Sequence, residues 1–191
     1  MCRFKSGIIL KDKVVIAPED NDSHSDLLES LGIEDSYIGA SKTFVRAELV
    51  PKNDSEWWID PAENPEKWMF VVDQDITPDW FDKETHEKEF RESICEWWRT
   101  HVLVDKKLED LRTGFYRLKR CDLKKLLNDV HVMLDSSQVG EMRGSSQVGE
   151  MWGSSQVGVM LDSSQVGKMR GSSQVGVMLD SSQVGEMWGS S

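Results

Sequence analysis

The chain has 191 residues and a formal net charge of −11, with 34 acidic against 23 basic residues. This acidity argues against nonspecific binding to nucleic acids and to anionic membrane surfaces, because both carry negative charge. No stretch approaches the roughly 18 consecutive apolar residues of a membrane-spanning helix, and no apolar signal core follows the amino terminus. We therefore expect a cytoplasmic protein that binds neither nucleic acid nor membrane.

Cysteine and histidine usage gives no sign of a metal or cofactor. The three cysteines, Cys2, Cys95 and Cys121, form no CxxC pair, which is typical of a reducing compartment and of a chain without structural zinc. The four histidines have no ligand spacing to one another. We expect neither a metal site nor a cofactor.

The first part of the chain, residues 1–104, is predicted to be an α+β module. Apolar runs at 2–10 and 14–17 indicate a hairpin around a charged turn. A short helix from Asp26 to Leu31 is expected after capping serines, and alternating residues predict a strand at 43–50.

A further strand is expected at 68–72, followed by a helix start at Thr77 and Pro78 and by an amphipathic helix over 84–99. Because neighbouring strands alternate with helices, we expect a mostly antiparallel sheet. The carboxylates between strand and helix could hold a hard cation, or could equally be helix caps and first-turn acids. They are Asp73, Asp75, Asp79 and Asp82.

Residues 105–126 are expected to be a connecting segment and solenoid lead-in, followed by a repeat region at 127–191. From Ser136 onward the nine-residue string SSQVG-x-M-x-(G/D) recurs without insertion, after a degenerate copy that begins at Leu127. A helix is excluded because nine residues at about 100° each place successive valines on opposite faces. One continuous strand is excluded because its side chains alternate between two faces, so a repeat of nine residues would turn the Val of each copy to the other face. The chain must turn in every copy, which predicts a parallel β-solenoid with Val and Met inside.

The variable places of the repeat favour two copies per coil, hence an 18-residue coil and a stack of about three and a half coils. Opposite charges and an Arg between two Trp rings then become neighbours. Three copies per coil would give less favourable stacked pairs of side chains at these places. The stacked sets are Glu150, Lys168 and Glu186 on one flank, beside Trp152, Arg170 and Trp188.

One step of this stack is unfavourable, since Asp162 lies above Asp180 and needs a turn that exposes both carboxylates to water. The alternative for the whole region is a disordered tail rich in Ser, Gly and Gln. Such a tail has no reason to keep Val and Met in strict phase, so the solenoid is preferred.

Cys2 is the candidate catalytic residue. Removal of Met1 would leave its thiol beside the α-amino group, which can act as its base as in N-terminal-nucleophile hydrolases. Arg46 and His24 could then orient a carboxylate or transfer a proton. The alternative is a small apolar residue at the start of an edge strand.

A binding surface is expected at exposed aromatic residues. Trp57 and Trp58 lie in a polar loop, where they form a contact surface or cover one end of the sheet. On the solenoid, the expected binding residues are Trp152, Arg170 and Trp188.

Several stretches carry a resemblance to a known family: MCRFKSGIILKD, SHSDLLESLGIED, FVRAEL, VDQDITPDWF and LKRC. They resemble a family of uncharacterised proteins from bacteriophages and gut bacteria, with an MCRFKSG-type amino-terminal module followed by a short-repeat SSQVGxM solenoid. The resemblance implies a two-part layout and a phage or mobile-element setting, hence the cytoplasm of a bacterial host or a phage-infected cell. It implies no activity and no functional residues.

Three functions are compatible with these patterns. The first is a non-enzymatic binding protein, in which the α+β module recognises a protein partner and the solenoid is a spacer or self-association surface. The second is a thiol enzyme that uses Cys2. The third, motivated by the phage resemblance, is an inhibitor of a host defence protein.

Overall fold

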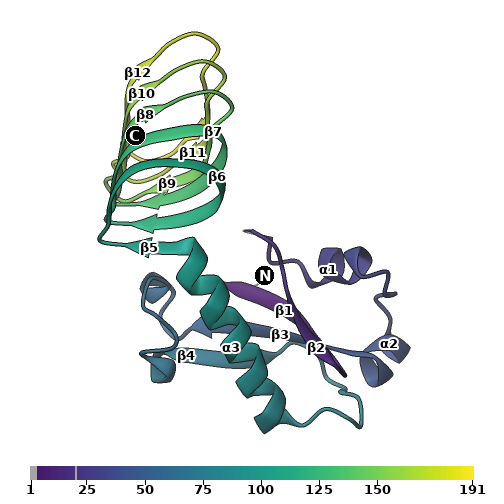
Figure 1. Cartoon of the computed structure of the whole chain (residues 1–191). Helices are drawn as coiled ribbons and strands as arrows, with labels where there is room; N and C mark the ends of the chain where they lie inside the picture. The colour runs from purple at the N-terminus through teal and green to yellow at the C-terminus, as the bar shows by residue number, and fades with distance from the viewer. Residues whose placement is uncertain (1–3, 20) are drawn as a thin grey trace. The chain divides into compact units, whose positions relative to one another are not determined.

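The structure is a computed structural model that describes residues 4–19 and 21–191. It divides into two compact units, Met1–Thr100 and His101–Ser191. The predicted fold class is confirmed: an antiparallel sheet with helices is followed by a parallel β-solenoid (Figure 1).

The first unit is built on a four-stranded antiparallel sheet in the order β2-β1-β3-β4. Helix α3 packs on this sheet, where Phe90 meets Phe70 edge to face with ring centroids 5.5 Å apart. A second apolar cluster joins the sheet to α1 through Ile8 and Leu28. The elements are β1 (Lys5–Leu10), β2 (Lys13–Ile16), α1 (His24–Ser30), α2 (Tyr37–Lys42), β3 (Phe44–Pro51), β4 (Trp68–Val72) and α3 (Lys83–His101), with 3-10 turns η1 (Asp54–Glu56) and η2 (Pro65–Lys67).

Two helix boundaries differ from expectation. The helix start predicted at Thr77 and Pro78 is wrong, because this segment is a loop and α3 begins at Lys83. Asp82 is the residue that caps it, since its Oδ1 accepts a hydrogen bond of 2.9 Å from the Thr85 amide. Helix α2 was not predicted, because it is only six residues long and contains a glycine, a poor helix former.

The second unit is a two-sided solenoid of about five coils. It begins at Val102, so the segment 105–126, expected to be a connecting segment and solenoid lead-in, is itself part of the first coils. The elements are β5 (Val102–Val104), β6 (Lys107–Lys119), β7 (Asp122–Asp135), β8 (Gln138–Met142), β9 (Gln147–Trp152), β10 (Gln156–Met160), β11 (Gln165–Met169), β12 (Gln174–Met178) and β13 (Gln183–Met187).

We name the two sides by their strands. The first face continues from the start of β7 through β8, β10 and β12, and the second face continues from the end of β7 through β9, β11 and β13. Within the repeats the paired strand residues are parallel and 18 places apart, as Gln156 is from Gln174. The prediction of two repeats per coil is therefore confirmed.

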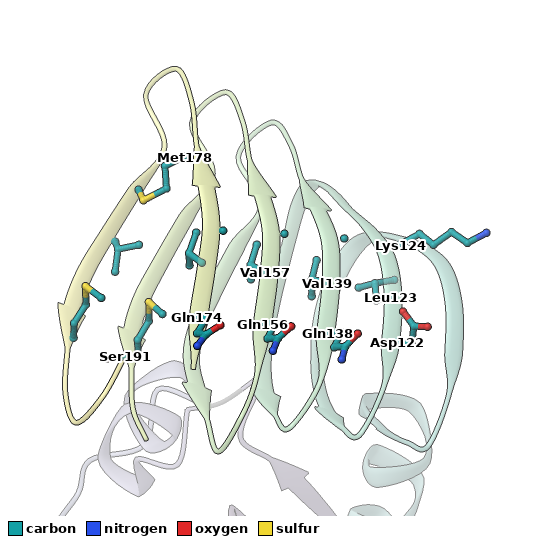
Figure 2. A pocket seen from close by; sticks show the side chains of 17 residues that line it. Asp122, Leu123, Lys124, Gln138, Val139, Gln156, Val157, Gln174, Met178 and Ser191 are labelled. Carbon is teal, nitrogen blue, oxygen red and sulfur yellow. The ribbon is translucent and has the colours of Figure 1, made fainter. Parts of the chain in front are cut away.

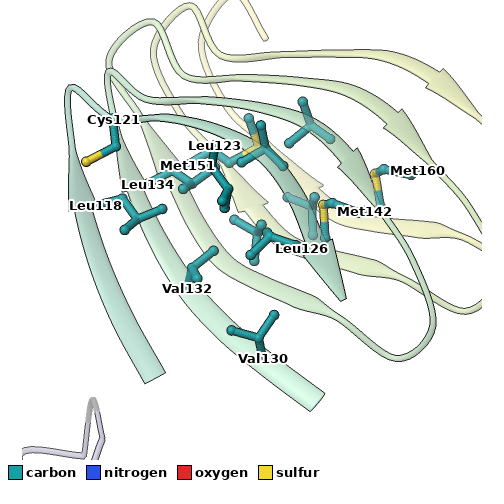
Figure 3. Packing of buried hydrophobic residues seen from close by; sticks show 14 of the residues in the cluster. Leu118, Cys121, Leu123, Leu126, Val130, Val132, Leu134, Met142, Met151 and Met160 are labelled. Atoms are coloured by element: carbon teal, nitrogen blue, oxygen red, sulfur yellow. The ribbon is translucent and has the colours of Figure 1, made fainter. Parts of the chain in front are cut away.

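Val and Met of the first four repeats fill the interior, as predicted (Figure 3). In the first four copies they are at most 2% exposed. In the last two copies the valines are half-buried and Met178 and Met187 are 42% and 59% exposed, since no described coil lies on top of them.

Glycine at the fifth place of the repeat is required by a close approach between coils. A Cβ on Gly158 would lie 2.5 Å from the carbonyl oxygen of Gly140, and one on Gly167 would lie 2.6 Å from that of Gly149. The absence of a side chain lets the backbone bend between Val and Met, so that both point inward although they are three residues apart.

The stacked aspartates occupy a favourable turn. Asp162 and Asp180 have φ of 56° and 55°, in the left-handed region that Gly and Asp tolerate best. The Asp162 carboxylate accepts a hydrogen bond of 2.9 Å from the Gly144 amide, and the Asp180 carboxylate accepts one of 3.2 Å from the Asp162 amide. Each carboxylate thus binds the turn of the coil below, which offsets the like-charge contact.

Candidate functional site

The last described coil of the solenoid, called the open end here, presents most of the exposed large apolar side chains of the second unit. It exposes Val177, Met178 and Leu179 on the first face and Met187 and Trp188 on the second. A cavity of about 660 Å³ reaches from this end along the first face. Figure 2 shows a row of Gln138, Gln156 and Gln174 beside the valines, with Met178 and Ser191 at the end of the stack.

The predicted flank of charged and aromatic residues lies on the second face. Lys168 pairs in register with Glu150 and Glu186, and its Nζ is 3.7 Å from the Glu150 carboxylate. The indole of Trp152 donates a hydrogen bond of 2.7 Å to Glu150, and that of Trp188 donates one of 3.1 Å to Glu186. The carboxylates therefore fix both indoles on the outer surface of the coil.

The two loop tryptophans of the α+β unit, for which a contact surface or a cover of the sheet end was expected, differ in exposure. Trp57 is buried, and its carbonyl accepts a hydrogen bond of 3.3 Å from the indole of Trp98, so it covers the core. Trp58 is half-buried. The exposed large apolar residues of this unit are Tyr37 and Ile38 on α2, whose helix was missing from the sequence prediction, and Met69 on β4.

The proposed catalytic residues are only partly described. Cys2 lies outside the described residues. Arg46 pairs with Asp35, and its guanidinium lies 5.0 Å from the ring of Phe44. His24 is brought next to Asp73, with Nδ1 3.3 Å from the carboxylate.

The four aspartates of the loop after β4 do not gather around one point among the described residues. The described set whose ligand atoms lie within 4.8 Å of one another is His24, Glu48 and Asp73. Only Asp73 belongs to both groups. Sequence spacing gave no signal for this set, because its three members are far apart in the chain.

The two described cysteines are free thiols. Burial raises the pKa of the Cys95 thiol and that of the Cys121 thiol, which lies in the core. The Cys121 thiol also donates a hydrogen bond of 3.2 Å to the Leu103 carbonyl. Neither is placed as a nucleophile.

No helix of the described chain has the length and apolar character needed to cross a bilayer. Comparison with known protein families, with curated proteins and with solved structures gave no match.

Proposed function

We propose that this chain is a non-enzymatic binding protein, whose α+β unit recognises a protein partner and whose solenoid self-associates through its open end. One observation carries the proposal. Met160 and Met169 are at most 1% exposed, whereas the methionines at the same place one coil further are 42% and 59% exposed. Methionines at the same place of the repeat are therefore buried in one coil and exposed in the next.

The open end offers two attractive features to another chain. Covering a fully exposed methionine contributes about 1.5–3 kcal/mol, and the last coil presents several apolar side chains of this size. Strands β12 and β13 each pair with a neighbour on one side. Their other edges present backbone donors and acceptors that can extend a sheet.

A second copy of the same chain is the occupant that this surface favours. Within the solenoid, a strand of sequence QVGxM pairs with other strands of sequence QVGxM. Two open ends facing each other about a twofold axis would use the same patch on both copies, and such an interface closes at a dimer. The solenoid then acts as a spacer between two α+β units.

The partner surface of the α+β unit is proposed at α2. Tyr37 and Ile38 are its most exposed large apolar residues. They adjoin a shallow depression of about 820 Å³ between α2, the β1–β2 turn and Trp80. Apolar residues beside a concave surface are typical of protein interfaces.

Light scattering coupled to gel filtration, run from low to high micromolar protein, tests self-association. We expect a concentration-dependent dimer that persists at high salt, because the contact is apolar. Met178→Glu should give a monomer. Val159→Glu is the matched control, since it adds the same charge on the same face where Glu141 already occurs one coil earlier, and it should still dimerise. A wild-type monomer at all concentrations would refute the proposal.

A further inference from the structure

Three side chains from three separate elements meet on one side of the α+β sheet. His24 is the first residue of α1, Glu48 lies in β3, and Asp73 directly follows β4. One ligand atom of each lies within 4.8 Å of the others. The three offer an imidazole nitrogen and two carboxylate oxygens.

The imidazole of His24 is oriented by the backbone. Its Nε2 is 3.1 Å from the Ala47 carbonyl oxygen, which can only accept a hydrogen bond, so Nε2 carries a proton. In the neutral ring Nδ1 then carries a lone pair and can only accept a hydrogen bond. It faces the Asp73 carboxylate at 3.3 Å. Two acceptors at this distance need a proton or a metal ion between them.

The spacing of His24 and Asp73 matches that of two ligands of one metal ion. Two ligands that lie about 2.0–2.1 Å from a tetrahedral ion are separated by about 3.3–3.4 Å, and the distance between His24 Nδ1 and Asp73 Oδ2 is 3.3 Å. A ligating histidine almost always donates its other ring N–H to a carboxylate or a backbone carbonyl. The Ala47 carbonyl has that role here.

The backbone holds all three residues before any ion binds. Ser23 caps α1 by accepting a hydrogen bond of 3.1 Å from the Asp26 amide. The Asp73 amide donates a hydrogen bond of 2.9 Å to the Arg46 carbonyl. Glu48 makes an interaction of its own, but a carboxylate has two oxygens and can keep one contact while it binds an ion.

We propose that His24, Glu48 and Asp73 bind one divalent transition-metal ion of the zinc or manganese class. One nitrogen and two oxygens suit these ions, whereas Mg²⁺ and Ca²⁺ prefer oxygen ligands alone. His24 is buried and the Asp73 side chain is 60% exposed, so the ion would keep an open position for water or for an anionic ligand. This site is independent of the self-association proposed above.

The test uses the full chain, treated with a chelator and titrated with Zn²⁺ and Mn²⁺ by calorimetry in a Cys2→Ser background, which removes a terminal thiol ligand. We expect one ion per chain. Asp73→Asn and Glu48→Gln should each weaken binding by about 10-fold or more, whereas Asp75→Asn, a neighbouring exposed acid, should leave it unchanged. Circular dichroism of each variant confirms its fold.

Nitrogen NMR of the imidazole distinguishes a proton from a metal ion between the two groups. A metal ion shifts the His24 Nδ1 resonance upon titration, and Asp73→Asn removes this shift. If Asp73→Asn binds as tightly as its parent, or if Nδ1 is protonated in the chelated protein and does not change when metal is added, the proposal is wrong. The pair is then an ordinary ion pair.

Discussion

Gly167→Ala is predicted to break the solenoid in its middle. The new Cβ would lie 2.6 Å from the carbonyl oxygen of Gly149, whereas an ordinary contact starts near 3.4 Å, so β11 must move from β9 by about 0.8 Å. Overpacking of this kind costs about 1–3 kcal/mol. Weakening a neighbouring ladder hydrogen bond, such as the 2.9 Å bond from the Arg170 amide to Met151, adds about 1 kcal/mol. We expect a loss of about 2–4 kcal/mol.

Urea unfolding followed by circular dichroism gives the overall loss, and hydrogen exchange by mass spectrometry locates it. Because each coil contacts only its neighbours, amides of β9, β11 and β13 should exchange faster while those of the α+β sheet do not. Two controls use the same chemistry. Gly185→Ala should release β13 alone, and Gly171→Asp should cost less than Gly167→Ala, because its Cβ would lie 3.0 Å rather than 2.6 Å from the carbonyl oxygen of the coil below and Asp162 has the same backbone conformation at the same place of the repeat. If Gly167→Ala and Gly171→Asp cost the same, close approach of the coils is not the reason for glycine.

Three further changes test local contacts. Ser155→Ala removes a buried hydroxyl that donates a hydrogen bond of 2.7 Å to the Trp152 carbonyl and should cost about 1 kcal/mol in urea unfolding. Ser164→Ala removes an equally buried hydroxyl with no partner among the described residues and should cost less; the reverse order would contradict this explanation. The Arg120 guanidinium holds the pKa of Asp105 below its usual range. The contribution of this pair to folding stability is therefore complete above about pH 4, the pKa of the unfolded Asp, and is lost as the pH falls through the lower pKa of the folded state. Arg120→Gln should raise the Asp105 pKa in an NMR titration, and an unchanged midpoint would refute the assignment. Since burial raises the pKa of the Cys121 thiol, iodoacetamide should label it much more slowly in the folded chain than in urea at the same pH, and equal rates would show that the thiol is accessible.

The repeat region was the most predictable part of the chain. Its odd period excludes a helix and a single strand, and the charges at positions 150, 168 and 186 select an 18-residue coil, which the register confirms. The first coils were missed because they lack the SSQVG string. Their strands pair over shorter steps, as between Lys107 and Asp122, so no fixed period marks them.

The α+β unit was predictable in its strands but less so in its sites. Apolar alternation indicated β3 and β4, whereas the proximity of His24, Glu48 and Asp73 depends on which strands pair and on where α1 packs. Trp57 could not be assigned from sequence, because a Trp in a polar loop can either face water or cover the core. Its hydrogen bond to Trp98 depends on a helix 41 residues away.

The alternation of the two faces restricts how this solenoid can change its length. Duplication of two adjacent copies inserts a whole coil and leaves every later residue over its former type of neighbour. Duplication of a single copy transfers all later copies to the opposite face, which places Val177 instead of the oppositely charged Glu186 above Lys168. Tandem expansion of such a gene should therefore be retained in even numbers of copies, and related chains should differ in length by multiples of the 18-residue register.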